Sequence, residues 1–359
     1  MHKTGIEDYT VQKDGKRLRY GYTTGTCAAA AAKAATQLLL TGAAPKTVRI
    51  DTPKGIPLNL EVLEPKLLDG TASCAIRKSS GDDPDVTDGV LVYAAVSAAE
   101  RPGILIDGGV GVGRVTKPGL RQAIGEAAIN PVPREMIRRA VEEAAEECEP
   151  PKGLSVVISI PEGVALAEKT FNPRLGIEGG ISILGTSGIV EPMSEDALVD
   201  SIVLEIRQRK ALGDTRLILT PGNYGADFLK ERYGVSDERI VKCSNYIGKF
   251  VKLSGGIMNT HSREGDCRAE LMASAALLSG ADADTARAMF DCVTTNEMLR
   301  VLEERGALEN TLRMLKTRTE FALSARTKGQ ITCGAIVFTG GNRELYRTET
   351  AMLWTEGTI

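Results

Sequence analysis

Hydrophobic residues near the middle of the chain form a pattern that predicts a strand, a loop and a helix in succession. Ile181–Leu184 is short and largely apolar, which is typical of a buried strand. Gly185–Gly188, with the sequence GTSG, interrupts the run, and Ser194 is placed to cap a helix that extends toward Leu212. Glycine loops that follow strands are where open α/β sheets bind ligands. This stretch therefore predicts either a ligand-binding loop or a tight strand-to-helix connection.

The pattern of the first half predicts an α+β domain. Cys27–Leu40 carries a run of alanines, which favour helix and let a neighbouring backbone pack closely. An antiparallel meander is expected over Thr47–Asp51, Leu58–Leu63 and Thr71–Ile76. The other expected elements are a helix over Gly89–Ala99, a strand over Gly103–Asp107, a helix over Arg134–Cys148 and a strand over Leu154–Ile160.

The second half alternates between helix and strand, which predicts an open, doubly wound α/β sheet. The expected elements cover Asp196–Leu212, Thr215–Thr220, Ala226–Tyr233, Ile240–Cys243 and Asn245–Leu253. A second glycine loop, Gly222–Gly225, follows a strand as the first one does. Because 359 residues suffice for two cores, we expect one domain over 1–165 and another over 166–359.

Composition narrows the classes of function. The net charge of -3 gives no reason to expect nucleic-acid binding, and no apolar run is long enough to span a membrane. The seven cysteines are odd in number and lack a CxxC pair, which favours reduced thiols in the cytoplasm. Since the histidines are His2 and His261 alone, we expect no protein-bound metal. The polar start, Met1–Lys16, predicts no signal peptide.

Candidate chemistry first occurs where the alanine-rich helix begins. Thr23, Thr24, Gly25 and Thr26 stand at this point, and a helix start with hydroxyl groups and glycine is a natural anion site. Cys27 could have a lowered pKa there. We favour a small residue packed at the helix start, because no catalytic histidine is near in the sequence.

A polar loop, Lys78–Asp88, is the second candidate. Its sequence, KSSGDDPDVTD, places donors beside acceptors, namely Lys78, Ser79, Ser80, Asp82, Asp83 and Asp85. The loop predicts either a base with a polar clamp or a solvated acidic loop that caps the next helix. Its spacing does not match a calcium-binding loop.

The third candidate is the glycine-rich stretch Gly108–Gly113, which lies between Asp107 and the cations Arg114 and Lys117. It does not follow the dinucleotide-binding fingerprint, because Thr116 stands where a third glycine is needed. The stretch predicts either a backbone cradle for carboxylates or a glycine-rich hairpin.

Together these segments resemble the CbiD family, the cobalt-precorrin-5B C1-methyltransferases of anaerobic cobalamin synthesis. The resemblance rests on the order and length of the segments along the chain. They are RYGYTTGTCAAAAAKAA (Arg19–Ala35), KSSGDDPDVTDG (Lys78–Gly89), IDGGVGVGRVTKPGL (Ile106–Leu120), INPVPR (Ile129–Arg134), FNPRLGIEGGISILGTSGIVEPMS (Phe171–Ser194), GNYG (Gly222–Gly225), KCSNYIGK (Lys242–Lys249) and NTHSR (Asn259–Arg263).

The resemblance implies a fold and a reaction. The reaction is methyl transfer from S-adenosylmethionine to C1 of a ring-contracted cobalt corrinoid, which gives cobalt-precorrin-6A. The cobalt would belong to the substrate and not to the protein. The implied fold joins an N-terminal α+β domain, similar to domain 2 of ribosomal protein S5, to a C-terminal open α/β sheet domain. The first domain would form a wall for the corrinoid, and the second would hold S-adenosylmethionine.

On this interpretation the candidate residues divide by role. S-adenosylmethionine is expected at Gly185, Thr186, Ser187, Gly188, Gly222, Asn223, Tyr224 and Gly225. The corrinoid is expected at Thr23, Thr24, Gly25, Thr26, Lys78, Ser79, Ser80, Arg114, Lys117 and Arg263. The catalytic candidates are His261, Asp82, Asp83 and Asp107, and the sequence does not rank them. His261 could accept a proton, bind a carboxylate or only cross-link its loop.

Two other classes of protein stay open, a small-molecule phosphotransferase on an S5-like fold and a non-catalytic corrinoid carrier. The first is disfavoured because the chain contains neither GxxxxGKS nor GxxxxGKT, the sequences of a phosphate-binding P-loop. A homo-oligomer is also left open by the sequence.

Overall fold

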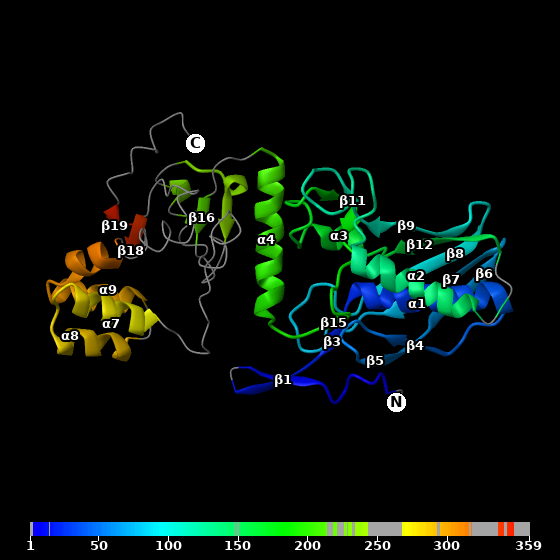
Figure 1. Cartoon of the computed structure of the whole chain (residues 1–359), viewed down its shortest axis with the longest axis horizontal. Helices are drawn as coiled ribbons and strands as arrows, with labels where there is room; N and C mark the ends of the chain where they lie inside the picture. The colour runs from blue at the N-terminus through cyan, green and yellow to red at the C-terminus, as the bar shows by residue number, and fades with distance from the viewer. Residues whose placement is uncertain are drawn as a thin grey trace. The chain divides into compact units, whose positions relative to one another are not determined.

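The computed structural model describes residues 3–13, 15–146, 148, 151–213, 218–220, 226, 227, 229–231, 234–242, 268–292, 295–315, 317, 337–340 and 343–347. The chain divides into two compact units, the first made of Met1–Leu198 with Arg207–Asp214 and the second of Val199–Ile206 with Thr215–Ile359. Both units combine helices with strands (Figure 1), which confirms a mixed α/β protein.

The first unit holds most of the described regular structure. Its helices are α1 (Thr24–Thr41), α2 (Pro131–Ala145), α3 (Gly163–Ala167) and parts of α4 (Glu195–Ala211). Its strands are β1 (Thr10–Lys13), β2 (Lys16–Arg19), β3 (Gly21–Tyr22), β4 (Thr47–Asp51), β5 (Pro57–Glu61), β6 (Leu63–Leu68), β7 (Thr71–Arg77), β8 (Leu91–Ala99), β9 (Gly103–Gly108), β10 (Gly111–Val112), β11 (Arg114–Val115), β12 (Gly153–Ser159), β13 (Ile177–Glu178), β14 (Gly180–Ile181) and β15 (Ile189–Val190).

Five strands form the main sheet, in the order β6-β7-β8-β12-β9. Neighbours from β6 to β12 run antiparallel, whereas β12 runs parallel to β9. A parallel pair requires a crossover connection, and α2 supplies it because it lies between β9 and β12 in the chain. Buried residues alternate with more exposed ones along β8 and β12, so one face of the sheet is directed to the core.

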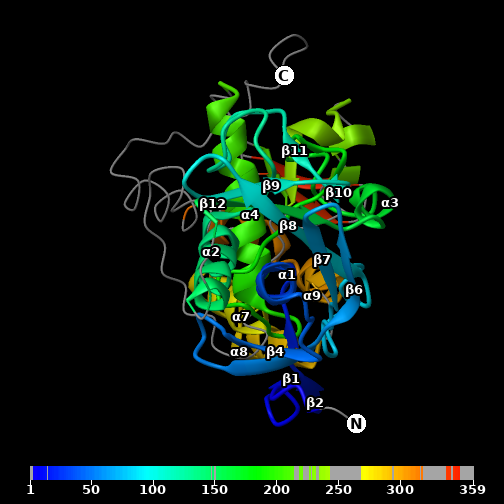
Figure 2. The same cartoon turned by 90° about the vertical axis from the view of Figure 1, so that its right-hand side faces the viewer.

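Helix α1 lies at the centre of the first unit. It packs against α2, against β7 and β8 of the sheet, and against β4. Figure 2, which looks along α1, shows the helix enclosed by these elements. Ala28–Ala32, Ala34 and Ala35 are fully buried, which confirms the close packing predicted from the alanine run. Because alanine adds only a methyl group, the neighbouring backbones can approach the helix on every side.

The segment expected as a helix over Gly89–Ala99 is instead strand β8, so that prediction was wrong. Val92, Ala94 and Val96 point into the core with a period of two. The alanines of this segment favour helix in isolation. Pairing with β7 on one side and with β12 on the other overrides that preference, because it provides hydrogen-bond partners for the backbone N–H and C=O groups and buries the valine side chains.

The glycine-rich stretch after β9 packs backbone against backbone. Gly111 has a φ of +75°, and a Cβ there would lie 1.6 Å from the carbonyl oxygen of Ile160. A Cβ at Gly163 or at Gly180 would lie 2.2 Å from the carbonyl oxygen of Gly111. These glycines are therefore needed where β10 pairs with β14 and contacts α3.

Short strand pairs fasten residues 177–190 to the first unit. They join β3 to β15, β10 to β14 and β11 to β13. The first unit therefore extends beyond residue 165, where a boundary was expected, and it contains the loop Gly185–Gly188. Ser194 caps α4 as predicted, since its hydroxyl oxygen accepts the Ala197 N–H at 3.3 Å.

The described part of the second unit has a parallel strand pair and a helical cluster. Strands β16 (Ile218–Thr220) and β17 (Ile240–Lys242) pair in parallel, and Ile202 and Ile206 of α4 pack against Val241. The other elements are η1 (Asp237–Arg239), α7 (Arg268–Leu278), α8 (Ala283–Ala288), η3 (Met289–Asp291), α9 (Thr295–Glu304), β18 (Val337–Gly340) and β19 (Arg343–Arg347). Within the described ranges, no helix has the length and apolar character needed to cross a membrane.

The packing of α1 predicts that a larger side chain in the alanine run destabilises the protein. Ala31→Leu forces extra methyl groups into a filled position, so the free energy of unfolding should fall by about 1–3 kcal/mol. Urea denaturation followed by circular dichroism measures this change. Ala98→Leu, at an exposed position of β8, is the matched control and should change the free energy by less than about 0.5 kcal/mol. Equal losses in both variants would contradict the packing argument.

Candidate functional site

The candidate site is built around the start of α1, where two loops from distant parts of the chain meet. Thr23 caps the helix, because its hydroxyl oxygen accepts the Thr26 N–H at 3.3 Å. One loop, residues 78–88, is fastened by the Tyr22 N–H, which donates to the Ser79 carbonyl oxygen at 2.8 Å. The other is the GTSG loop, Gly185–Gly188. The structure thus brings together two loops that were assigned to different domains.

Carbonyl groups of Leu184, which precedes the GTSG loop, and of Gly188, which ends it, accept hydrogen bonds from the start of α1. The Leu184 carbonyl oxygen accepts one N–H and one hydroxyl of Thr23–Thr26, at 3.1 and 3.2 Å. The Gly188 carbonyl oxygen accepts a second N–H and a second hydroxyl of this segment, at 3.1 and 2.6 Å. Gly185 permits the approach, because a Cβ there would lie 2.3 Å from the Thr23 hydroxyl oxygen. Donors expected to bind an anion therefore bind carbonyl groups of the protein.

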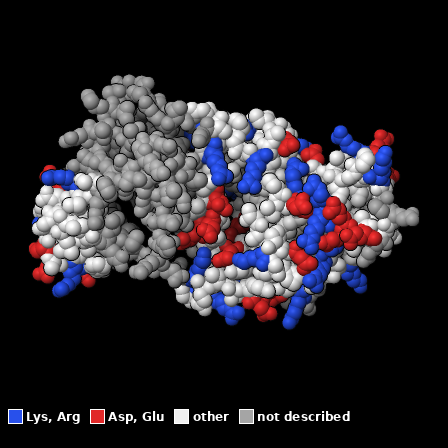
Figure 3. All heavy atoms as spheres, viewed as in Figure 1, with Lys and Arg blue, Asp and Glu red and all other residues white. Residues whose placement is uncertain are grey.

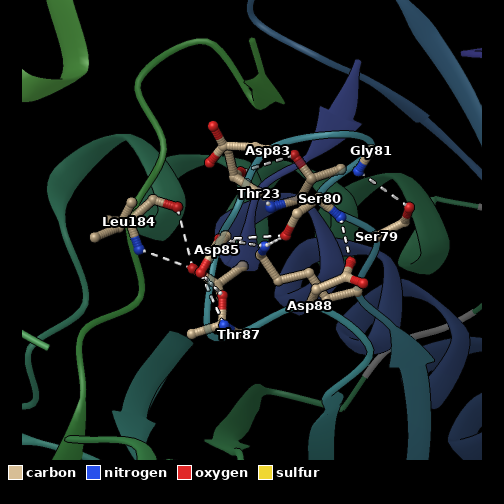
Figure 4. A network of polar contacts seen from close by, with 12 residues as sticks. Thr23, Ser79, Ser80, Gly81, Asp83, Asp85, Thr87, Asp88 and Leu184 are labelled. Carbon is tan, nitrogen blue, oxygen red and sulfur yellow. Dashed lines mark hydrogen bonds and ion pairs between the residues drawn. The ribbon is translucent and has the colours of Figure 1, made fainter. Parts of the chain in front are cut away.

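A buried polar network in the 78–88 loop is centred on Lys78, whose side chain is 2% exposed. Its ammonium group donates to Asp85 Oδ2 at 2.7 Å and to Ser80 Oγ at 2.5 Å. Asp85 Oδ1 accepts the N–H and the hydroxyl of Thr87, at 2.8 and 2.7 Å, and Asp88 accepts the Ser80 N–H at 2.7 Å. Figure 4 shows this network from close by. Lys78, expected to bind the corrinoid, is held inside the protein by these contacts.

The network and its surroundings set the charge states of two groups. Burial acts to raise the pKa of Asp85, but the Lys78 ammonium and the Thr87 donors outweigh it and hold that pKa below its usual value. Burial raises the pKa of the Cys27 thiol to about 12. Cys27 is therefore a neutral, packed residue, as favoured from the sequence, and not a nucleophile at physiological pH.

Two of the catalytic candidates are held in ion pairs. Asp82 binds Arg19 at 2.8 Å, and this hydrogen bond lowers the pKa of the carboxyl. Asp107 binds both terminal nitrogens of Arg114, at 2.8 and 3.0 Å, and these hydrogen bonds lower its pKa as well. A carboxylate whose pKa is lowered is a weaker base.

Asp83 is the third carboxylate in the 78–88 loop. Its Oδ1 accepts the Met193 N–H at 2.8 Å. In the part of the chain that the structure describes, no hydrogen bond reaches its second oxygen and no cation pairs with it. Since a carboxylate offers about four acceptor positions, Asp83 keeps capacity for a ligand.

The other two described cations expected near the corrinoid lie outside the Lys78 network. Arg114 binds Asp107 and donates to the Gly108 carbonyl oxygen at 2.8 Å, which joins β11 to the end of β9. Lys117 is exposed, and its side chain packs over Gly176, where a Cβ would meet Lys117 Cγ at 2.5 Å.

The remaining expected site residues lie outside the described residues, so their roles stay predictions. They are Gly222, Asn223, Tyr224, Gly225, His261 and Arg263. Among the residues with a described placement, no group of three or more His, Cys, Asp or Glu could hold a metal ion.

Sequence reasoning considered Thr87 only as a cap for the helix expected over Gly89–Ala99, and it did not single out Met193. Thr87 carries a usable signal, because an aspartate two residues before a hydroxyl residue is typical of a turn closed by its side chain. Met193 carries none. Its φ of +54° is a conformation in which glycine or asparagine would be expected.

Fold and site together define a mixed α/β protein whose first unit brings two loops to the start of α1, where Asp83 is a carboxylate that keeps capacity for a ligand. Its neutral Cys27 offers no nucleophile there. The chain belongs to the CbiD family. The sequence profile of CbiD matches residues 11–192, which include both loops of the candidate site. The profile described as CbiD, C-terminal domain, matches residues 259–349.

Curated relatives in this family carry the name of an enzyme, cobalt-precorrin-5B C(1)-methyltransferase. The relative from Ruminiclostridium cellulolyticum is 45% identical over 95% of this chain and 94% of its own. The relative from Alkaliphilus metalliredigens is 43% identical over 93% of each chain. A crystal structure of cobalamin biosynthesis protein (cbiD) from Archaeoglobus fulgidus is 30% identical, with a TM-score of 0.41, and covers 68% of this chain and 76% of that chain.

The buried ion pair predicts that stability depends on its charge balance. Asp85→Asn leaves the Lys78 ammonium without a counter-charge, so the free energy of unfolding at pH 7 should fall by about 3–5 kcal/mol. The folded-state pKa of Asp85 is lowered. Its stabilisation is therefore present above the unfolded pKa of about 3.9 and is lost as pH falls through the lower folded value. Urea denaturation at a series of pH values should show the deficit shrinking in acid.

A double variant controls for the change in shape at Asp85. Lys78→Met with Asp85→Asn removes both charges, so it should recover much of the stability that Asp85→Asn loses. If Asp85→Asn alone were as stable as the wild type, the buried Lys78 ammonium group would not depend on Asp85 as its counter-charge.

Proposed function

We propose that the chain transfers a methyl group from S-adenosylmethionine to C1 of cobalt-precorrin-5B, giving cobalt-precorrin-6A in anaerobic cobalamin biosynthesis. The observation that carries this proposal is the 45% identity to a named relative over 95% of the chain. The matched family region includes the α1 start and both loops. Cobalt enters as part of the macrocycle, so the reaction asks for no metal ligands from the protein.

For this reaction the main task of the protein is to position the methyl donor and the substrate carbon relative to each other. S-adenosylmethionine supplies a methyl group that is already activated by its sulfonium. C1 donates an electron pair to the methyl carbon, the carbon–sulfur bond breaks, S-adenosylhomocysteine leaves, and the macrocycle gives up one proton. Holding C1, the methyl carbon and the sulfur of the donor in line can lower such a barrier by about 7–11 kcal/mol. The neutral Cys27 thiol is consistent with direct transfer, because no covalent enzyme intermediate is required.

Asp83 is the described carboxylate that best fits the proton transfer. Asp82 and Asp107 are tied to arginines, and their lowered pKa values weaken them as bases. Asp83 keeps one oxygen without a described hydrogen bond and lies in the loop fastened to the start of α1. His261 stays a second candidate for this role.

For S-adenosylmethionine we propose the outer side of the GTSG loop. The carbonyl groups of Leu184 and Gly188 are engaged by α1, and the Ser187 hydroxyl donates to the Ile189 carbonyl oxygen at 3.0 Å. Thr186 has an exposed side chain, so it can offer a hydroxyl group to the ribose or the carboxylate of the donor.

Finer parts of the interpretation are proposals of the same kind. An S5-like topology for the first unit is supported by the helices α1 and α2 and by the β9–α2–β12 crossover. Residence in the cytoplasm is supported by the unpaired, buried thiols of Cys27 and Cys74. Basic and acidic side chains are interspersed over the face of the first unit in Figure 3, which favours a small-molecule partner over nucleic acid.

Incubation of the purified chain with cobalt-precorrin-5B and S-adenosylmethionine tests the proposal. We expect a product that is heavier by one methylene group in mass spectrometry, with one equivalent of S-adenosylhomocysteine. Calorimetry should detect binding of S-adenosylhomocysteine and not of ATP. Binding of ATP alone would indicate a phosphotransferase, and binding of the corrinoid without either nucleoside would indicate a carrier.

Asp83→Asn tests the assignment of the base. Asparagine can still accept the Met193 N–H, but it cannot take up a proton, so single-turnover methylation should slow by about 10²-fold or more with both affinities retained. Rapid-quench kinetics measures the rate. Asp82→Asn, which removes a charge from the same loop, is the control and should stay within a few-fold of the wild type. A wild-type rate for Asp83→Asn would move the base role to His261.

A further inference from the structure

Lys54 places its ammonium group beside both an aromatic ring and a carboxylate, next to the GTSG loop. Its Nζ lies 3.1 Å from Glu191 Oε2 and 4.9 Å from the centroid of the Tyr20 ring. We propose that Tyr20 and Glu191, which we call the cation site, bind the α-ammonium group at the methionine end of S-adenosylmethionine. In the free chain the Lys54 ammonium takes its place. The proposal rests on the proposed function and deepens it, because it names residues that recognise the methyl donor by its charge.

Strand pairing brings the two residues of the cation site together. Strands β3 and β15 pair antiparallel, with Gly21 opposite Val190 (Figure 1). Continuing this register by one residue places Tyr20 opposite Glu191. Residues opposite each other across an antiparallel pair have their side chains on the same face and in reach of one another. The fold therefore supplies an aromatic face and a carboxylate to one place from two distant segments.

The position of Tyr20 is fixed by the protein itself. The Tyr20 N–H donates to the Tyr9 carbonyl oxygen at 3.0 Å, and the N–H of the preceding Arg19 donates to Asp82 Oδ2 at 2.7 Å. The Tyr20 side chain is half-buried and packs against the core of the first unit. Because the ring is already ordered, binding a ligand costs little conformational entropy there. Asp82 adjoins Asp83, so the cation site is joined to the loop that carries the proposed base.

Lys54, by contrast, is held at the cation site by a weak interaction. The Lys54 and Glu191 side chains are 37% and 36% exposed, and ion pairs with such exposure contribute little to stability. The backbone of Lys54 is anchored separately, because its N–H donates to the Ser187 carbonyl oxygen at 3.0 Å. This bond stays when the side chain moves away. A ligand with an ammonium group can therefore displace Lys54 without disturbing the loop.

An α-ammonium group is the part of the methyl donor that matches the cation site. The face of a tyrosine ring attracts cations, and a carboxylate adds the opposite charge and accepts N–H groups. The hydrogen bond from Lys54 lowers the pKa of Glu191, so that carboxylate is ionised at neutral pH. Lys54 and the methionine end of the donor carry the same primary ammonium. We assign the ammonium rather than the sulfonium, because a carboxylate beside the sulfonium would stabilise the charge that methyl transfer removes.

Two ligands separate recognition of the ammonium group from recognition of the nucleoside. S-adenosylhomocysteine carries the α-ammonium, whereas 5′-methylthioadenosine has the same adenosine and sulfur without the amino-acid end. In calorimetry on the full chain, Glu191→Gln should bind S-adenosylhomocysteine about tenfold more weakly, the loss of one charge-assisted hydrogen bond, and bind 5′-methylthioadenosine as the wild type does. Tyr20→Phe keeps the ring and should retain most of the affinity for S-adenosylhomocysteine, and Tyr20→Leu should lose several-fold.

A matched control removes a carboxylate from another exposed ion pair. Glu135→Gln breaks the pair of Glu135 with Arg138, at 2.9 Å on α2, and should leave both affinities unchanged. Unfolding midpoints verify that each variant is folded, and Glu191→Gln decides the question if Tyr20→Leu does not fold.

The outcomes distinguish the cation site from the proposed function. Wild-type affinity for S-adenosylhomocysteine in Glu191→Gln, or an equal loss for 5′-methylthioadenosine, would overturn the cation site and leave the proposed function standing. A much larger loss for S-adenosylmethionine than for S-adenosylhomocysteine would place the sulfonium there and also overturn it. If the wild type neither binds S-adenosylhomocysteine nor methylates the corrinoid, the proposed function fails, and the cation site fails with it.

Discussion

The buried ammonium group of Lys78 is the constraint on which the candidate site depends. A lone charge removed from water is costly, so the fold must place an anion beside it. Asp85 meets this need and saturates both of its oxygens with Lys78 and Thr87. The loop from residue 78 to residue 88 is thereby closed on itself, and Asp83 is presented toward Met193. The buried Lys78–Asp85 pair thus fixes the loop that carries Asp83.

Small residues are the second requirement, because two loops must reach the start of one helix. Gly25 leaves room for Pro133 and for the Leu184 carbonyl group, and Gly185 leaves room for Thr23. The fully buried Ala28–Ala32 let the sheet and α2 close around the same helix. These small residues depend on one another. A side chain added at any of them would push apart backbones that the threonine hydrogen bonds hold together.

Local signals predicted the elements better than their arrangement. The alanine helix, the strand after Leu154 and the cap at Ser194 follow from propensity and capping, and the structure confirms them. Strand β8 was wrongly predicted as a helix, because its alanines favour helix and its pairing with β7 and β12 is not visible in the local sequence.

The site residues show the same limit. The sequence marked Thr23–Thr26, the 78–88 loop and the GTSG loop as separate candidates. They come together at the start of α1 only because strands distant in the sequence pair, for example β10 with β14. Nothing local marks Lys78 as buried or Met193 as strained. Within four positions, Asp82, Asp83 and Asp85 have the same chemistry but different surroundings. Arg19 neutralises the first and Lys78 the third, so two neighbouring charges are removed from the field that a ligand would meet at Asp83.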